Sequence, residues 1–358
     1  MPLPTPEPLV EIVRQAAESR QALCITGGNS KYFYGNPPAA EHVRLDITRY
    51  QGIVDYEPSE LVITARAGTP LQELEHELEQ QGQMLAFEPP RFSPATTLGG
   101  CIAAGLSGPR RIYAGAARDF VLGSKLLDGQ GRVLVFGGQV MKNVAGYDVS
   151  RLMTGAMGTL GVLLEISLKV LPMPAMERTL SFAMTMEKAL ETMRYCATRP
   201  LPVSATCFIN ERLYIRLSGR EAAVVAAQQL LGGDVDDESG TTLWESIRHH
   251  THSFFHDQAI LWRLSVKPTA APLPLPGKQM IEWGGALRWF VPDDAIAAEQ
   301  VQALAVASGG HATLFYGDKA CAQAFQPLSP ALLVIHQRLK QQFDPVGIFN
   351  PNRMYPEL

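Results

Sequence analysis

Short apolar runs with the two-residue alternation of β-strands recur through the first half of the chain. Clusters of glycine and other turn residues separate them, and one cluster, Asp128-Gly-Gln-Gly131, has the composition of a hairpin turn. The last run ends at Pro172, because proline cannot continue a central strand. The predicted strands span residues 22–26, 60–66, 121–127, 132–136 and 161–171.

A helix is predicted after the second of these strands. Leu71, Leu74 and Leu78 recur at the spacing of one helix face, which predicts an apolar stripe toward the core. Thr69 and Gln72 have the spacing of a capping box, in which two side chains satisfy free backbone N–H groups at the helix start. We therefore expect an amphipathic helix that begins directly after this box.

Beyond Pro172 the glycine density falls and the pattern changes to strands mixed with longer helices. Such a pattern is typical of an α+β lobe, and its two similar sets of elements suggest two ferredoxin-like halves. The proline-rich segment 268–276 is predicted to be a loop between them, and Ser329-Pro330 to start a last helix. The elements of the two halves are predicted at residues 179–184, 187–197, 203–209, 213–217 and 221–231, then at 260–266, 280–291, 295–307 and 312–316.

Composition narrows the class of protein. The chain has 358 residues, of which 46% are hydrophobic and 18% charged, with a formal net charge of -4. This length suits a globular protein with two cores, and the charge supplies no broad cationic field for nucleic acid or an anionic membrane surface. The start lacks the basic and apolar regions of a secretory signal, and no apolar run approaches about 18 residues. We expect a cytoplasmic protein with a small-molecule ligand.

Cysteine and histidine spacing gives no support for a metal site. The five cysteines include no C-x-x-C pair, which argues against iron–sulfur or structural zinc ligation. His249, His250, His252 and His256 lie close together, but their spacing fits no compact zinc pattern. We expect this cluster at an exposed helix end or loop, and no bound metal.

Two glycine-rich segments could bring bare main chain close to a ligand. Gly27-Gly-Asn-Ser30 follows a predicted strand and offers backbone N–H groups of the kind that a diphosphate needs, although an ordinary turn explains it equally well. Thr97–Gly108 holds four glycines in a stretch of helical length. Each interior glycine costs a helix about 1 kcal/mol relative to alanine, so close approach of a ligand or of another backbone should offset that cost. A tightly packed helix without a ligand is the alternative.

A third glycine-rich region, Gly146-Tyr-Asp148 followed by Gly155–Gly161, again comes directly before a strand. Three such segments in one half of the chain favour a shared ligand over three unrelated turns. The G-x-G-x-x-G spacing of a Rossmann dinucleotide fold is absent. A nicotinamide-dependent enzyme is therefore disfavoured.

These motifs resemble those of the vanillyl-alcohol oxidase / p-cresol methylhydroxylase (PCMH-type) flavoproteins, and within them the FAD-binding E subunits of bacterial glycolate oxidases. The resemblance covers essentially the whole chain. It rests on Gly27-Gly-Asn-Ser30, Thr97-Leu-Gly-Gly-Cys101, Lys142-Asn-Val-Ala-Gly-Tyr-Asp148, Gly158-Thr-Leu-Gly161 and Asp344-Pro-Val-Gly-Ile-Phe-Asn-Pro351.

The resemblance implies a two-lobed α+β fold. A PCMH-type FAD-binding domain is expected at residues 1–172, an α+β, ferredoxin-like cap at 173–329, and a C-terminal segment, 330–358, that returns to the FAD domain. The cofactor is expected to be FAD. The residues that the resemblance assigns to it are Gly27, Gly28, Asn29, Ser30, Thr97, Leu98, Gly99, Gly100, Cys101, Ala104, Gly105, Gly158, Thr159, Gly161, Val162 and Asn350.

The resemblance also implies a function and partners. The chain is expected to be one subunit of a complex that oxidises glycolate or a similar 2-hydroxy acid, with a second FAD subunit and an iron–sulfur subunit as partners. Such a complex would place it in the cytoplasm, with any contact to the inner membrane made only through the complex. Two alternatives stay open: a stand-alone FAD oxidase, and a non-catalytic flavin-bearing subunit that stabilises its partners.

Two departures from the family pattern shape these expectations. Many members bind flavin covalently through a histidine in the first glycine loop, but here Asn29 stands in a loop without histidine, so dissociable FAD is expected. Members that oxidise 2-hydroxy acids without partner subunits resemble one another in a metal site of paired histidines and a Glu-His pair. This chain has only Gly309-Gly-His311, so we expect turnover to require partner subunits.

Arg263 and Arg288 are the candidate substrate contacts. Each is a cation in a predicted strand among bulky apolar residues, and a guanidinium there could hold a carboxylate bidentately. Solvated or salt-bridged structural arginines are the alternative. Arg110, Arg111 and Tyr113 follow the small-residue helix and could contact phosphate or the flavin ring, or belong to the charged surface. The catalytic base stays unassigned.

Overall fold

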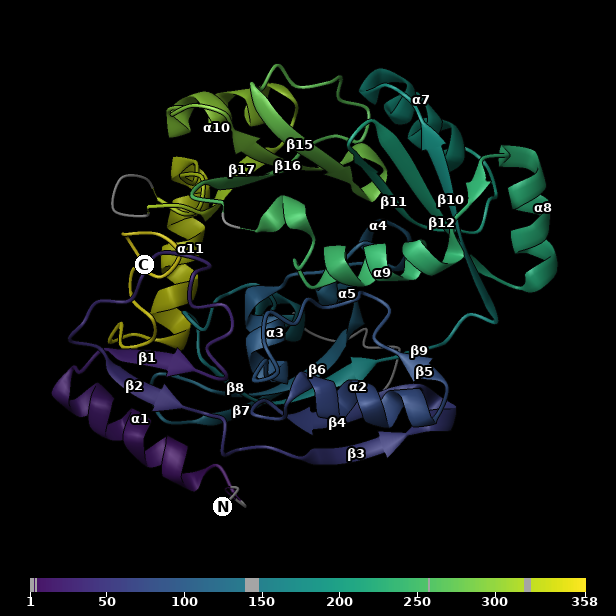
Figure 1. Ribbon diagram of the computed structural model, residues 1–358. Coiled ribbons are helices and arrows are strands. Elements are labelled where there is room, and N and C mark those ends of the chain that lie inside the picture. Colours follow the sequence, from purple (N-terminus) through teal and green to yellow (C-terminus); the bar gives the residue numbers. More distant parts are fainter. Residues whose placement is uncertain (1–2, 4, 139–147, 257, 319–322) are drawn as a thin grey trace.

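The computed structural model describes residues 3, 5–138, 148–256, 258–318 and 323–358. Figure 1 shows two lobes, the lower formed by the first part of the chain and the upper by the second. The Lys142–Tyr147 part of one motif, its glycine Gly146 included, lies outside the described residues, as does Cys321.

The lower lobe is built on an antiparallel sheet of five strands within the described ranges, in the order β3-β4-β8-β6-β7. The predicted hairpin around Asp128-Gly-Gln-Gly131 is confirmed as the β6–β7 pair. The long strand predicted to run to Leu171 instead stops at Lys169, and β9 turns aside to pair with β5. The strands are β3 (Ile53–Glu57), β4 (Val62–Arg66), β5 (Gln83–Met84), β6 (Val121–Leu127), β7 (Val133–Gly137), β8 (Val162–Lys169) and β9 (Leu171–Pro172).

Helix α2 shows where the local sequence was interpreted correctly and where it was not. Leu71, Leu74 and Leu78 are fully buried, as the predicted stripe requires. The capping box is wrong, because Thr69 lies outside the helix and its hydroxyl accepts a 2.9 Å hydrogen bond from Gly52 N–H instead. The other helices of this lobe are α1 (Glu7–Ser19), α3 (Leu98–Ala104), α4 (Arg111–Ala114), α5 (Ala117–Phe120) and α6 (Val149–Leu152), beside α2 (Leu71–Gln80).

A small parallel pair, β1 (Leu23–Thr26) and β2 (Val43–Asp46), completes the lower lobe. The last helix, α11 (Pro330–Phe343), starts at the Ser329 N-cap and brings the C-terminal segment back to this pair, where Phe349 bridges to Leu23. Asp344 fixes the return, because its carboxylate accepts hydrogen bonds from the backbone N–H groups of residues 347–349.

The upper lobe holds one eight-stranded sheet within the described residues, in the order β13-β10-β12-β11-β15-β16-β14-β17. The two predicted halves are joined edge to edge, because β11 pairs with β15. The segment predicted at 280–291 is a β15–β16 hairpin rather than one element. The strands are β10 (Met176–Ala183), β11 (Val203–Ile209), β12 (Arg212–Gly219), β13 (Asp234–Val235), β14 (Leu261–Ser265), β15 (Gly277–Glu282), β16 (Leu287–Pro292) and β17 (His311–Tyr316).

The two faces of this sheet differ in what covers them. Helices α7 (Met186–Ala197), α8 (Glu221–Leu231) and α10 (Ala298–Ala307) pack on the outer face, whereas α9 (Asp237–Arg248) lies between the sheet and the lower lobe (Figure 1). The inner face shares one apolar cluster with Tyr34, Ala104 and Met157 of the lower lobe. The lobes therefore meet through a packed interior.

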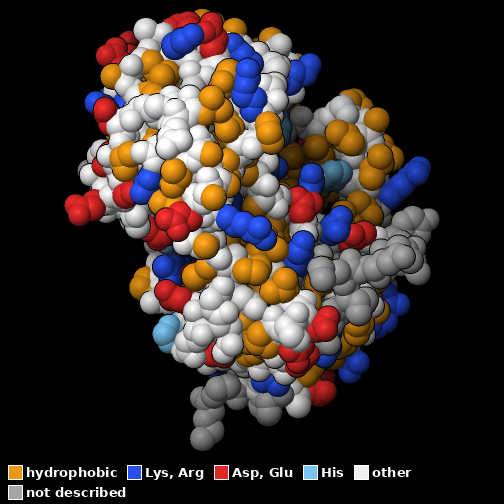
Figure 2. Space-filling view, turned by 90° about the vertical axis from the view of Figure 1, so that its right-hand side faces the viewer, with side chains coloured by type: hydrophobic (Ala, Val, Ile, Leu, Met, Phe, Trp, Pro, Cys, Tyr) orange, Lys and Arg blue, Asp and Glu red, His pale blue; other side chains and the backbone are white. Residues whose placement is uncertain are grey.

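Charged residues join the lobes beside this cluster. Figure 2 shows acidic and basic side chains gathered across the middle of the molecule, between the lobes. Glu88 of the lower lobe contacts Arg110 at 3.2 Å and, across the boundary, Arg216 of β12 at 2.7 Å. Arg110 in turn pairs with Glu177. The division at residues 1–172, 173–329 and 330–358 stays a prediction.

Candidate functional site

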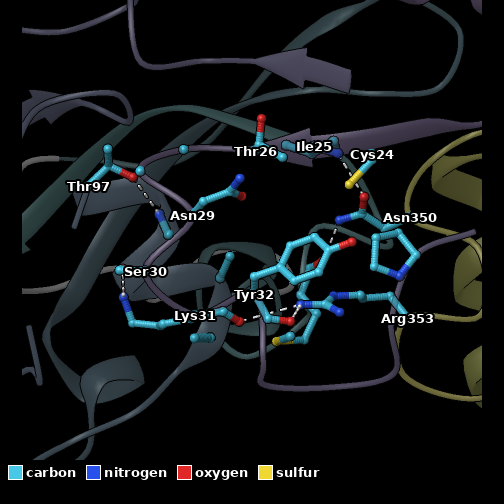
Figure 3. Close-up of a pocket in the computed structure, with 17 residues that line it drawn as sticks. Cys24, Ile25, Thr26, Asn29, Ser30, Lys31, Tyr32, Thr97, Asn350 and Arg353 are labelled. Atoms are coloured by element: carbon cyan, nitrogen blue, oxygen red, sulfur yellow. Dashed lines mark hydrogen bonds between the residues drawn. The ribbon is translucent and has the colours of Figure 1, made fainter. Parts of the chain in front are cut away.

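The loop Gly27–Ser30 borders a pocket in the lower lobe, close to the returning C-terminal segment. Figure 3 shows Thr97 and Asn29 on one side of this outer pocket, with Asn350 and Arg353 on the other and Tyr32 beside Arg353. A second, inner pocket adjoins it and has a more apolar end at Met153, Leu160 and Leu163. Both pockets are bordered by Ile25, Gly27, Gly100, Ala103, Met157 and Asn350, so they form one continuous binding groove.

The first glycines of the loop are required by chain packing. A Cβ atom at Gly27 would overlap the Thr97 hydroxyl, and one at Gly28 would overlap the carbonyl oxygen of Ala95. The Thr97 hydroxyl also accepts a 3.2 Å hydrogen bond from Gly100 N–H, which caps α3. The bare main chain of the loop is therefore held against the start of α3 on one side and borders the groove on the other.

Three non-glycine residues that line the groove have positive φ angles: Asn29 at 55°, Met157 at 53° and Asn350 at 40°. Left-handed backbone is uncommon outside glycine and costs about 1 kcal/mol or more where the side chain is bulky. Strained conformations of this kind cluster at ligand sites, where the surrounding structure holds them.

The Asn350 side chain holds the groove together. Its Oδ1 atom accepts a 2.8 Å hydrogen bond from Ile25 N–H, and its Nδ2 atom donates a 2.7 Å bond to the Met157 carbonyl. Lys340 supports the same region, since its Nζ donates to the carbonyls of Thr159 and Phe349 at 2.8 and 2.7 Å. The C-terminal segment therefore builds one wall of the groove.

Two cations border the outer pocket without a carboxylate partner among the described residues. Lys31 Nζ lies 3.4 Å from the Ser30 hydroxyl and 5.8 Å from the centre of the Phe92 ring. Arg353 donates to the backbone carbonyls of Tyr32 at 2.9 Å and of Asn36 (Figure 3). Burial lowers the pKa of both groups. An anion between them would offset the cost of their burial.

Most of the predicted cofactor residues meet at this groove. Those that line it are Gly27, Gly28, Asn29, Ser30, Thr97, Gly99, Gly100, Ala104, Gly158, Gly161 and Asn350. Others lie behind its walls: Leu98, Cys101 and Val162 are in the core, Gly105 ends α3, and the Thr159 hydroxyl donates to Ala156 O. Their role toward a cofactor stays a prediction.

Lys31 and Arg353 were missed by the sequence analysis. The signal was present for both, because Lys31 directly follows the first glycine motif and Arg353 follows the last one by two positions. A basic residue beside a diphosphate loop is the expected counter-charge.

The two candidate substrate arginines lie on opposite faces of the upper sheet. Arg263 pairs in register with Trp289 and faces the lower lobe, whereas Arg288 pairs with Leu264 and faces outward. Arg288 is fully buried and donates to the carbonyls of Gly285 and Ala270 at 2.8 and 3.2 Å. Its outward direction does not favour a substrate contact from the groove side, and the role of Arg288 toward substrate stays a prediction.

The histidine cluster lies at the end of α9, as expected, and His256 is exposed, but His249, His250 and His252 are only partly exposed. His250 is enclosed by Phe255, Phe315 and Trp289, and burial lowers its pKa to about 3. The apolar neighbours were not visible from local sequence because they come from distant strands. In the described part of the chain, no group of three or more His, Cys, Asp or Glu side chains could hold a metal ion.

Comparisons with known proteins identify the lower lobe. Residues 4–137 match the family described as the FAD binding domain, so FAD is the cofactor. The chain is 47% identical over 350 residues, 98% of its length and 97% of the relative's, to glycolate oxidase subunit GlcE of Escherichia coli (strain K12). It is 28% identical over 168 residues to D-lactate dehydrogenase of Anaerostipes hadrus, covering 47% of this chain and 35% of that one.

A solved structure titled alkyldihydroxyacetonephosphate synthase shares the fold, with a TM-score of 0.67 at 16% identity over 96% of this chain and 74% of that one. The groove suits FAD in its chemistry. The diphosphate is anionic and matches the two unpaired cations, whereas the apolar inner end suits an aromatic ring system. No helix in the described residues combines the length and apolarity of a membrane crossing.

Proposed function

The chain belongs to the family of the glycolate oxidase subunit GlcE, and from that premise we propose that it is the FAD-binding subunit of a complex that oxidises glycolate to glyoxylate. The observation that carries the proposal is the groove itself. Three glycine-containing segments and the C-terminal segment converge on it. At its outer end, Lys31 and Arg353 have no acidic partner within the described part of the chain. We assign the fold of the lower lobe to the PCMH type.

Within the groove, the loop Gly27–Ser30, Lys31 and Arg353 hold the FAD diphosphate. The Gly158–Gly161 segment and the apolar inner residues accommodate one of the two aromatic ring systems of the cofactor. Bound FAD supplies the two-electron chemistry by accepting hydride from Cα of the hydroxy acid. The chain contributes position, exclusion of water and the charge that faces the substrate.

The FAD is held non-covalently. No histidine lines the groove among the described residues, and the position within the first loop that carries the attachment in many relatives of this fold is Asn29. Denaturation in acid should therefore release all flavin into the supernatant, whereas a yellow pellet would contradict this part of the proposal.

On the substrate side, Arg263 holds the carboxylate. It faces the lower lobe from β14 and shares its apolar surroundings with Tyr34, Ala104 and Met157, which connect it to the groove. A half-buried guanidinium is suited to the carboxylate that all 2-hydroxy acids share.

The partners proposed for this chain are a second FAD subunit and an iron–sulfur subunit that passes electrons onward. The complex is cytoplasmic, and any membrane contact is made through these partners. Glycolate-dependent reduction of a dye by the co-expressed complex tests the function. A variant chain that cannot hold FAD, such as Lys31→Met with Arg353→Met, should abolish it, and activity that survives in a complex of normal composition would reduce this subunit to an assembly role.

A further inference from the structure

Two arginines from different lobes lie against one tryptophan. Arg111 belongs to α4 of the lower lobe, and its guanidinium carbon lies 4.4 Å from the centre of the Trp283 ring. Arg263 belongs to β14 of the upper lobe, and its guanidinium carbon lies 5.1 Å from the same ring and 5.9 Å from that of Trp289. Such distances are those of cation–π contacts, which orient both guanidiniums.

Trp283 is fixed at the boundary between the lobes. Its side chain is buried, and its Nε1 atom donates a 3.0 Å hydrogen bond to the carbonyl of Gly108 in the lower lobe. Gly108 follows α3, whose last residue, Ala104, borders the groove. Ala104 and Trp283 also belong to the same apolar cluster. The tryptophan therefore connects both arginines, through this apolar cluster, to the part of the lower lobe that borders the outer pocket.

Neither guanidinium has a hydrogen bond or an ion pair with another described residue, although both are half-buried. The neighbouring Arg110 shows the contrast, because it pairs with Glu88 and Glu177. Burial lowers the pKa of both Arg111 and Arg263, and the Arg263 charge lowers that of Arg111 further. Two like charges in a half-buried space are costly unless an anion joins them.

The acids nearest to this pair are already engaged. The Asp119 carboxylate accepts a 2.8 Å hydrogen bond from Ala116 N–H at the start of α5. Glu282 accepts a 2.7 Å bond from Trp289 Nε1, and burial raises its pKa to about 7, so at neutral pH it is partly protonated. Neither carboxylate forms an ion pair with Arg111 or Arg263, and the positive charge of the pair stays available.

We propose that Arg111 and Arg263 form one anion site between the lobes, supported by Trp283, which takes the carboxylate of the 2-hydroxy acid. The proposal rests on the proposed function and extends it by adding a residue of the FAD-binding lobe to the substrate contacts. Because one arginine comes from each lobe, neither lobe holds the anion alone. A guanidinium pairs bidentately with a carboxylate, so two of them match a two-carbon dicarboxylate better than a monocarboxylate. Oxalate should therefore bind more tightly than glycolate.

Calorimetric titration of the FAD-loaded full chain with oxalate, and separately with glycolate, tests the site without turnover. Wild type should bind one oxalate, and Arg111→Met and Arg263→Met should each weaken that binding about 10-fold or more. Arg220→Met, which removes an exposed arginine at the start of α8 in the upper lobe, is the matched control and should leave the affinity unchanged. Arg111→Lys and Arg263→Lys keep the charge, so their oxalate affinities should lie between those of wild type and of the methionine variants.

The flavin spectrum and the thermal midpoint of each variant separate misfolding from loss of the site. Wild type that carries FAD but binds no oxalate at millimolar concentration would overturn the anion site, as would folded Arg111→Met protein with wild-type affinity. Either result leaves the proposed function intact if the complex still reduces dye with glycolate. The proposed function instead fails if the complex still reduces dye with glycolate when this chain holds no FAD.

Discussion

Asn350 donates a 2.7 Å hydrogen bond from its side-chain amide to the carbonyl of Met157, although 193 positions separate the two residues. Met157 and Asn350 both have positive φ angles, and both line the binding groove. The bond therefore connects two strained positions, one before strand β8 and one in the C-terminal segment. It explains how a segment near the chain end contributes to a pocket formed mainly by the first half of the chain.

Asn350→Ala should weaken both the fold and the groove. The substitution leaves Ile25 N–H and the buried Met157 carbonyl without partners, which costs about 1 to 3 kcal/mol per orphaned group. We expect a lower thermal midpoint and FAD affinity reduced about 10-fold, measured by calorimetry. Gln342→Ala, an exposed amide at the end of α11, should change neither quantity. Equal FAD affinity in Asn350→Ala would show that the bond does not shape the groove.

Gly28→Ala should displace the first loop. The added Cβ would overlap the carbonyl oxygen of Ala95, which is backbone and cannot rotate away. Since overpacking of this kind costs about 1 to 3 kcal/mol and moves the main chain, FAD binding should fall at least 10-fold in titrations followed by flavin fluorescence. Gly138→Ala, where a Cβ meets no atom within 4 Å, is the control. Matching FAD affinities in the two variants would refute the packing argument.

Glu88→Gln should loosen the lobe interface. Burial raises the pKa of Glu88, but the Arg216 and Arg110 charges more than offset this and hold it below its ordinary value. Removing the charge leaves the buried Arg216 guanidinium without an acidic partner among the described residues and leaves Arg110 paired with Glu177 alone, so unfolding should become easier by about 3 to 5 kcal/mol in denaturant titrations. Glu191→Gln, which breaks an exposed pair with Lys188, should cost less than about 1 kcal/mol.

The direction of the Glu88 pKa shift determines how the stability difference between wild type and Glu88→Gln depends on pH. Because the pKa of Glu88 is depressed in the folded state, the stabilisation is present above the ordinary value of 4.5 and is lost as the pH falls below it. The difference between wild type and Glu88→Gln should therefore be largest near neutral pH and shrink below about pH 4. A difference that does not vary with pH would contradict the charge assignment.

Glu282→Gln should stabilise the fold at alkaline pH, whereas Glu88→Gln destabilises it. Burial raises the pKa of Glu282 to about 7, against the Trp289 hydrogen bond and the Arg263 charge. A raised acid pKa means that stability declines as the pH rises from 4.5 toward 7. The glutamine variant avoids this ionisation and should be more stable than wild type by about 1 to 3 kcal/mol at pH 8, with the gain disappearing near pH 5. Thermal unfolding at both pH values measures it, and a variant less stable at pH 8 would refute the prediction.

Local patterns predicted much of the fold. The β6–β7 hairpin and the stripe of α2 depend on neighbours within a few residues, and both were predicted correctly. Strand β3 was missed, and the capping role of Thr69 was wrong because its hydroxyl bonds instead to Gly52, a residue 17 positions away. The joining of β11 to β15 likewise depends on pairing between distant segments.

In the candidate site, too, some residues could be predicted from local sequence and others could not. The glycine motifs pointed to residues that the fold brings together, because each motif needs bare backbone locally. Arg263 and Arg288 looked equivalent in sequence, but the register between β14 and β16 sends them to opposite faces of the sheet. For Arg111 the sequence left a contact with phosphate or the flavin ring and a place in the charged surface equally open, because its contact with Trp283 joins two lobes. Long-range register and packing between lobes decide such roles, and local sequence contains neither.

FAD binding by the purified full chain tests the central claim most directly. We predict a yellow protein with one FAD per chain, all of it released by acid, and a clearly weaker affinity in the Lys31→Met/Arg353→Met variant, with Lys188→Met on the exposed face of α7 as the control. A folded wild-type chain that is colourless and takes up no added FAD would contradict the account.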